Sequence, residues 1–181
     1  ANRQLGFGLA FVAGAINAGG FLAVQQYTSH VTGMVSALID TLSEALGPRA
    51  GPFALLGNSL GGSLAMCAAA QDRRVRACVT NGGSIDPVAG MVAFPRAARR
   101  PGAMLGPDAS PEDATALLNT LDLPAAVQSM PAALLCVHGG QDPLVSDSEV
   151  ARLQALRPDM DVMRWPDGLP NTDSTVGMAG S

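Results

Sequence analysis

With 181 residues, the chain is long enough to form one domain with a buried core. Apolar residues make up 48% of the sequence and charged residues 14%, which excludes disorder as the main state and favours buried parallel strands or a segment in lipid. The net charge is -4, and the eleven basic residues are scattered arginines. Because the chain lacks a basic surface for phosphate backbones, we expect no nucleic-acid partner.

The first feature along the chain is an uncharged apolar run over residues 5–24. Its length is that of a helix crossing a bilayer. Small residues also recur four positions apart, at Gly14 and Ala18 and at Ala15 and Gly19, as they do where membrane helices pack closely. We interpret 5–24 as a candidate membrane helix in an otherwise cytoplasmic protein. A secretory signal and a buried helix folded back over a sheet are the alternatives.

The N-terminal stretch FVAGAINAGGFLA, followed by YTSHVTG, resembles the first membrane segment and next loop of the YoaK-like family of small integral membrane proteins. The likeness covers about residues 1–37 and implies no chemistry. It places His30 in a loop. We therefore divide the chain into an apolar segment, 1–37, and a second domain, 38–181.

From residue 34 onward, the pattern predicts helices alternating with strands. Such alternation is typical of the α/β class, with right-handed crossovers and a parallel sheet. The predicted helices are 34–46, 60–71, 111–120, 123–129 and 146–157, and the predicted strands are 53–58, 75–80, 132–138 and 160–165. A Pro-, Gly- and Arg-rich excursion begins at residue 86, and we expect residues 86–130 to form a small lid above the sheet.

The motif Gly57-Asn58-Ser59-Leu60-Gly61 stands between a predicted strand and a predicted helix of small residues. A nucleophilic serine needs this context, because flanking glycines relieve crowding at a strained turn and the helix dipole favours negative charge. The motif predicts that Ser59 is a nucleophile. The alternative is a tight turn with an ordinary serine.

A carboxylate follows a later predicted strand, in the stretch His138-Gly-Gly-Gln-Asp142-Pro143. An acid in such a loop can orient the histidine of a catalytic triad. Asp142 is therefore the candidate acid, and a turn or cap aspartate before Pro143 is the alternative.

These two motifs, with their surroundings GNSLGGSLAMCAAAQDRRVRACVTNGG and LDLPAAVQSMPAALLCVHGGQDPLV, resemble the α/β-hydrolase family over about residues 38–168. The branch indicated contains dihydroxypseudooxynicotine hydrolase and polyketide-shortening hydrolases. The resemblance implies hydrolysis of an ester, or of a carbon-carbon bond beside a ketone, in a small-molecule carbonyl substrate without a cofactor. It also implies that Ser59 is the nucleophile, Asp142 the acid and the Leu60 backbone N–H an oxyanion donor.

The sequence departs from that family at the general base. The family places a histidine after the last strand, but the residues after Trp165 contain none, and only His30 and His138 exist. His138 is the candidate substitute base, although it does not fit the usual chain order. Without a base, a serine hydroxyl is a weak nucleophile, so we expect impaired hydrolysis.

The remaining chemistry-bearing residues are the three cysteines, Cys67, Cys78 and Cys136, all in apolar stretches without a CxxC spacing. They are interpreted as buried thiols, and we expect no metal site.

Part of the hydrolase pattern is also missing, because several strands normally precede the nucleophile. The apolar run 5–24, the change of resemblance near residue 37 and the lost histidine leave two alternatives to an impaired hydrolase. One is a membrane protein or membrane-anchored module that binds without catalysis. The other is a fused or frameshifted reading frame that joins two unrelated pieces near residue 37.

Overall fold

The computed structural model describes residues 28–93 and 110–165. The apolar run 5–24 and the middle of the excursion after residue 86 lie outside them. The described elements follow one another in the order α2 (Thr28–Leu46), η1 (Gly47–Arg49), β1 (Phe53–Asn58), α3 (Leu60–Gln71), β2 (Val75–Asn81), α4 (Pro87–Ala93), α6 (Pro111–Leu118), α7 (Leu123–Ser129), β3 (Ala133–Gly139), α8 (Asp147–Leu156) and β4 (Asp161–Trp165).

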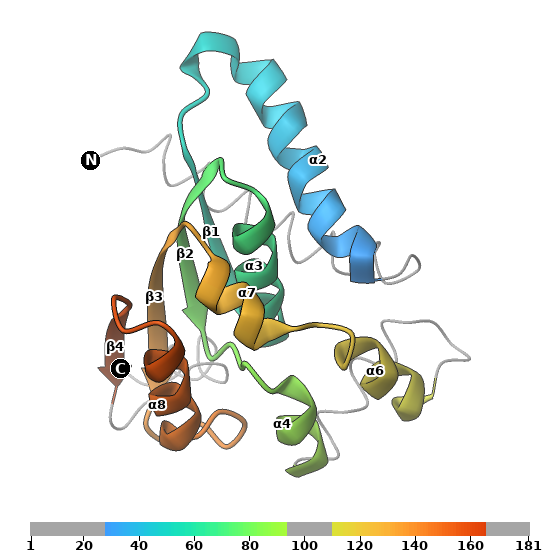
Figure 1. Ribbon diagram of the computed structural model, residues 1–181, viewed down its shortest axis with the longest axis vertical. Coiled ribbons are helices and arrows are strands. Elements are labelled where there is room, and N and C mark those ends of the chain that lie inside the picture. The colour runs from blue at the N-terminus through green and yellow to red at the C-terminus, as the bar shows by residue number, and fades with distance from the viewer. Residues whose placement is uncertain (1–27, 94–109, 166–181) are drawn as a thin grey trace, which may run out of the picture.

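The four strands form one parallel sheet in the order β1-β2-β3-β4. Because consecutive neighbours are joined by right-handed crossovers, the connecting helices all come to lie on one face of the sheet. Figure 1 shows this layer, with α3, α7 and α8 in front of the strands and α2 beside α3. The predicted α/β class is confirmed, and the four strands lie within a residue of their predicted bounds.

The core lies between the sheet and this helix layer. Every second strand residue points into it, including Leu55, Cys78, Leu134 and Cys136. Small side chains on α3 let this helix pack closely against β1 and β2, and its residues 65–69 are all buried. The three cysteines are free and buried, as predicted. Burial raises the pKa of Cys67 and Cys136 to about 11 and that of Cys78 to about 12, so the thiols stay protonated and unreactive.

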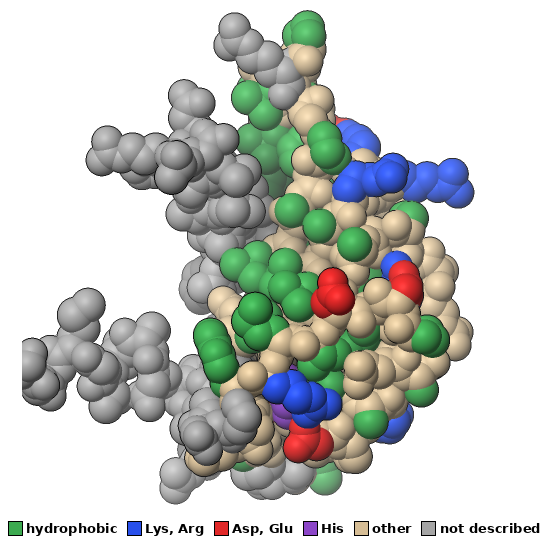
Figure 2. Space-filling view, turned by 90° about the vertical axis from the view of Figure 1, so that its left-hand side faces the viewer, with side chains coloured by type: hydrophobic (Ala, Val, Ile, Leu, Met, Phe, Trp, Pro, Cys, Tyr) green, Lys and Arg blue, Asp and Glu red, His purple; other side chains and the backbone are tan. Residues whose placement is uncertain are grey.

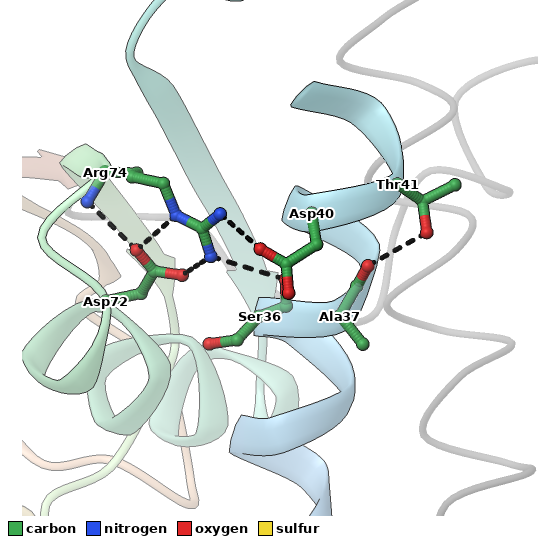
Figure 3. A network of polar contacts seen from close by, with 6 residues as sticks. All are labelled: Ser36, Ala37, Asp40, Thr41, Asp72 and Arg74. Atoms are coloured by element: carbon green, nitrogen blue, oxygen red, sulfur yellow. Dashed lines mark hydrogen bonds and ion pairs between the residues drawn. The ribbon is translucent and has the colours of Figure 1, made fainter. Parts of the chain in front are cut away.

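Helix α2 begins six residues before the predicted start and runs through residue 37 without a break. Its Ile39 is buried in the core, and Val35 packs against it. Figure 3 shows the polar side of this contact: Arg74, before β2, makes ion pairs with Asp72 at the end of α3 and Asp40 on α2. A domain division at 37/38 stays a prediction, but it falls inside a helix that is packed on the sheet domain.

Within residues 28–93 and 110–165, no helix combines the length and apolar character that crossing a membrane requires. The candidate membrane helix 5–24 lies outside these ranges, so its interpretation stays a prediction.

Candidate active site

Ser59 occupies the single residue between β1 and α3, and its backbone is unusual. Its φ of 53° and ψ of -128° make it the one non-glycine residue with positive φ in the described part of the chain. Such a conformation costs about 1–3 kcal/mol and persists only where the surroundings enforce it. The Ser59 N–H donates to the Asn81 carbonyl at 2.8 Å, and the Ser59 carbonyl accepts from the Gly62 N–H at 2.8 Å. The backbone therefore reverses sharply at Ser59, as the nucleophile-elbow motif predicts.

The two outer glycines of the motif have different roles. A Cβ at Gly57 would lie 2.6 Å from the Gly62 nitrogen and closer still to the Gly61 carbonyl, so only glycine fits there. A Cβ at Gly61 would meet no atom within 4 Å. The sharpness of the turn therefore depends on Gly57, where α3 folds back directly over the end of β1.

The Ser59 hydroxyl makes no capping hydrogen bond to α3. The serines that precede α6 and α8 behave differently, because Ser110 accepts from the Asp113 N–H and Ser146 from the Glu149 N–H. Among the described residues, no backbone carbonyl accepts the Leu60 N–H, which is the first of α3. An uncapped helix start with a free N–H favours negative charge. The half-buried hydroxyl of Ser59 thus stands beside a donor suited to an oxyanion.

Asp142 lies in the loop after β3. Its Oδ1 accepts from the Leu144 N–H at 2.8 Å and the Val145 N–H at 3.2 Å, and its own N–H donates to the Gly139 carbonyl at 3.0 Å. Its Oδ2 is buried and has no hydrogen-bond partner among the described residues. The carboxylate is therefore held by one oxygen while the other stays available as an acceptor.

Ser59 and Asp142 lie at the same edge of the sheet. Ser59 directly follows β1, Asp142 is three residues beyond β3, and all strands are parallel. Strand β2 runs between them, so the two strand ends are about 10 Å apart. No hydrogen bond joins Ser59 to Asp142 in residues 28–93 and 110–165.

His138, the candidate substitute base, is at the carboxyl end of β3 and 2% exposed. Its Nε2 lies 3.3 Å from Asp147 Oδ1 at the start of α8, and Arg164 makes an ion pair with the same carboxylate. No hydrogen bond joins His138 to Ser59 or Asp142 in residues 28–93 and 110–165, and its Nδ1 is buried there without a partner. His30 belongs to α2, so the loop position implied for it is wrong, and its side chain lies outside what the structure describes.

A polar link that the sequence analysis did not identify connects three elements at this edge. Glu149 on α8 accepts from the Ser84 hydroxyl and from the N–H groups of Ile85 and Asp86, at 2.9 and 3.2 Å. Ser84 in turn exchanges hydrogen bonds of 3.1 and 2.6 Å with Ser63 on α3. Glu149 therefore holds the loop after β2 against α8, and Ser84 links the same loop to α3.

The local signal at Glu149 suggests a different role. Ser146 and Glu149 have the spacing of a capping box, which predicts that the carboxylate bends back to its own helix start. Only the first half of that box forms here, since Ser146 caps the Glu149 N–H at 3.3 Å.

In the described residues, no three His, Cys, Asp or Glu side chains converge as they would around a metal ion. The chemistry-bearing groups at this edge are the Ser59 hydroxyl, the Asp142 carboxylate and the Leu60 N–H. A hydroxyl, a carboxylate and a helix N–H are the kinds of group that take part in acyl chemistry on a carbonyl.

Comparison with known proteins identifies the family of the chain. The profile of a family described as "Protein of unknown function (DUF1275)" matches residues 5–137, which is more than half of the chain. The chain belongs to the DUF1275 family. The family description assigns no activity, and the resemblance of residues 1–37 to YoaK-like proteins stays a prediction. No curated protein matches the chain in sequence.

Solved structures show the fold. The chain is similar to 2,6-dihydroxy-pseudo-oxynicotine hydrolase, with 22% identity and a TM-score of 0.65 over 81% of this chain and 41% of that one. AbyA5 is 18% identical, with a TM-score of 0.62 over 76% of this chain and 42% of that one. Est1E from Butyrivibrio proteoclasticus is 19% identical, with a TM-score of 0.58 over 81% of this chain and 63% of that one. The DUF1275 chain therefore has an α/β-hydrolase fold and spans about two fifths of the length of the first two structures.

Proposed function

We propose that the edge formed by Ser59, Leu60 and Asp142 is a serine-hydrolase site for a small-molecule carbonyl substrate, and that its turnover is impaired. The observation that carries this proposal is the positive φ of Ser59 with its uncapped hydroxyl. An ordinary helix-start serine would adopt an extended backbone and cap its helix, as Ser110 and Ser146 do. The strained backbone and the uncapped hydroxyl of Ser59 support a role as nucleophile.

In the proposed reaction, Ser59 Oγ attacks the carbonyl carbon of an ester, or of a ketone beside a scissile carbon-carbon bond. Negative charge develops on the carbonyl oxygen, where the Leu60 N–H can donate to it. Asp142 would hold and orient a base through its available Oδ2. The base must take the Ser59 proton and return it to the leaving group.

The impairment follows from the missing base. His138 is the one histidine whose side chain the structure describes, and its nearest charged partner is Asp147. Loss of the base from such a triad reduces kcat by several orders of magnitude, while the oxyanion donor and substrate binding retain some rate enhancement.

The test is labelling of the full chain with a fluorophosphonate, with and without added imidazole. We expect slow labelling at Ser59 alone and at least about tenfold faster labelling with imidazole, because a neutral imidazole can fit between Ser59 and Asp142 and act as the base. Ser59→Ala should abolish the labelling. Asp142→Asn should reduce the acceleration of labelling by imidazole, because a neutral amide accepts the imidazole N–H more weakly than a charged carboxylate does.

Ser146→Ala is the matched control, since it removes another helix-start serine and should leave labelling unchanged. The proposed site is wrong if folded protein gives no label at Ser59 with imidazole present, or if label appears on a different serine. Rapid hydrolysis of p-nitrophenyl esters without imidazole, lost in Ser59→Ala, would overturn the impairment alone.

A further inference from the structure

Glu149, in the first turn of α8, carries a carboxylate that the proposed reaction does not use. Its Oε1 accepts three hydrogen bonds from the loop after β2: one from the Ser84 hydroxyl, and two from the N–H groups of Ile85 and Asp86 at 2.9 and 3.2 Å. The Ser84 hydroxyl also accepts from the Asp86 N–H at 2.8 Å. Hydrogen bonds to a charged acceptor are stronger than those to a neutral one. Glu149 therefore anchors residues 84–86 to α8.

The anchored loop is bonded to both backbone polar groups of Ser59. Asn81, the last residue of β2, accepts the Ser59 N–H at 2.8 Å. Three residues further on, the N–H and the carbonyl of Ser84 bond to the Ser63 hydroxyl, at 3.1 and 2.6 Å. The Ser63 N–H donates to the Ser59 carbonyl at 3.4 Å. The conformation of Ser59 therefore depends on the segment that Glu149 holds.

Helix α3 and this loop also touch directly. A Cβ added at Gly83 would lie 1.9 Å from Thr80 Oγ1 and 3.0 Å from the carbonyl carbon of Gly62. The two hydrogen-bonded serines beside this contact are buried, Ser63 completely and Ser84 with 8% exposed. Because no side chain fits between the two backbones, a shift of the loop also shifts the first turn of α3.

The start of α8 also holds the proposed acid. The N–H groups of Leu144 and Val145, just before this helix, donate to Asp142 Oδ1 at 2.8 and 3.2 Å. Glu149 follows in the first turn of α8. One side chain thus joins the segment that holds the Asp142 carboxylate to the loop that is bonded to Ser59.

We propose that Glu149 is a positioning residue for the serine-hydrolase site proposed above, on which this role depends. The positive φ of Ser59 persists only while its surroundings enforce it. Without the carboxylate, three donors of the loop lose their acceptor, and Ser59 relaxes toward the extended backbone of an ordinary helix-start serine. Its hydroxyl then caps α3, and its spacing from Asp142 changes. Glu149 therefore keeps the nucleophile uncapped and at a fixed distance from the acid.

Other roles for the Glu149 carboxylate fit less well. A capping role would direct it to its own helix start, but its oxygen accepts from the loop at Ser84 instead. In the described part of the chain, no three His, Cys, Asp or Glu side chains converge on a cation site. Figure 2 shows the β4 side of the molecule, where the acidic side chains in view lie apart from one another. The contacts of Glu149 therefore favour a role at the loop after β2.

The test compares Glu149→Ala with Glu149→Gln in the full chain, by fluorophosphonate labelling with added imidazole. Alanine removes the acceptor, so we expect labelling of Ser59 to slow by at least about tenfold. Glutamine keeps an acceptor oxygen at the same place, so we expect a loss of less than about threefold. Ser146→Ala is the matched control, because it weakens the same helix start but leaves the bonds from Glu149 to the loop, and its labelling should equal that of the wild type.

A second variant tests the route through α3. Ser63→Ala removes the hydroxyl that bonds to Ser84, so it should also slow the labelling. The double variant Ser63→Ala, Glu149→Ala should label within about threefold of the slower single variant, because two residues in one network are not additive. Effects that multiply would overturn the proposed link between the loop and the nucleophile helix.

Hydrogen exchange of the full chain provides a measurement that needs no chemistry at Ser59. In Glu149→Ala, the peptide 59–63 should exchange at least about tenfold faster than in the wild type, whereas the β3 peptide 133–139 should keep its rate. An unchanged rate for 59–63 would overturn the role of Glu149. Faster exchange of both peptides would mean that Glu149 stabilises the whole fold, and would also overturn a positioning role.

The labelling experiment separates this role from the proposed function. Equal labelling of Ser59 in the wild type and in Glu149→Ala overturns the role of Glu149 and leaves the serine-hydrolase site intact. A folded wild type without label at Ser59 overturns the site itself, and the positioning role with it.

Discussion

Helices α3 and α8 both begin after a serine, and the two serines behave in opposite ways. Ser146 has an extended backbone, with φ -79° and ψ 160°, and its hydroxyl caps α8. Ser59 has positive φ, and its hydroxyl caps nothing in α3. The same residue type before a helix thus stabilises one turn and is strained in the other. The hydroxyl of Ser146 therefore stabilises the start of α8, whereas the hydroxyl of Ser59 stays free of its helix.

Among the substitutions that test this difference, Gly57→Ala should have the largest effect on stability. The added Cβ would collide with the Gly61 carbonyl and the Gly62 nitrogen, both backbone groups that cannot move aside alone. We expect the free energy of unfolding to fall by about 3 kcal/mol or more, measured by urea denaturation. Gly61→Ala is the matched control, with a change within about 1 kcal/mol, because its Cβ meets open space. Equal effects at both glycines would contradict the turn geometry.

A second substitution examines the α8 start. Ser146→Ala removes the acceptor of the Glu149 N–H and should lower the free energy of unfolding by about 1 kcal/mol. Ser59→Ala should change it by less than about 0.5 kcal/mol, because no cap is lost. Urea titrations of both variants measure the difference. A larger loss at Ser59 than at Ser146 would mean that its hydroxyl does stabilise the helix.

A pH experiment extends the comparison to the C-terminal end of α3. Hydrogen bonds from the Arg74 side chain lower the pKa of Asp72 to about 2, from an ordinary value of 3.8. Since the folded-state pKa is depressed, this stabilisation is fully present above about pH 4 and is lost as pH falls towards 2. We expect about 1 kcal/mol, because Arg74 is partly exposed and water screens the pair.

The measurement for this pair compares the wild type with Asp72→Asn in urea at several pH values. The difference in the free energy of unfolding should be constant near neutral pH and shrink below pH 4. A difference that stays the same at pH 2 would assign the effect to packing instead of to the ion pair.

A small effect in the opposite direction is expected for Ser59→Gly. Glycine adopts positive φ without a steric penalty, so the strain at this turn should be relieved. We expect the chain to become more stable by about 0.5–1 kcal/mol, offset in part by the backbone entropy of glycine, while fluorophosphonate labelling is lost. Ser146→Gly should be destabilised by a few tenths of a kcal/mol. A destabilised Ser59→Gly would show that the turn is unstrained.

The sequence by itself determined the kind and order of the strands and of α3, α7 and α8, whereas α4 was not predicted. Alternating apolar runs and helix starts predicted β1 to β4 and α3, α7 and α8 within about one residue, because hydrophobic period and turn residues act locally. The sequence also predicted that Ser59 directly follows β1 and that Asp142 lies in the loop after β3.

Only the tertiary structure decided what those residues contact. Ser59 has positive φ because α3 packs over Gly57 and the Asn81 carbonyl accepts its N–H. Glu149 has the spacing of a local cap but bonds to the loop at Ser84, 65 positions away. Such partners depend on how β2, α3 and α8 pack together, and no local pattern encodes that arrangement.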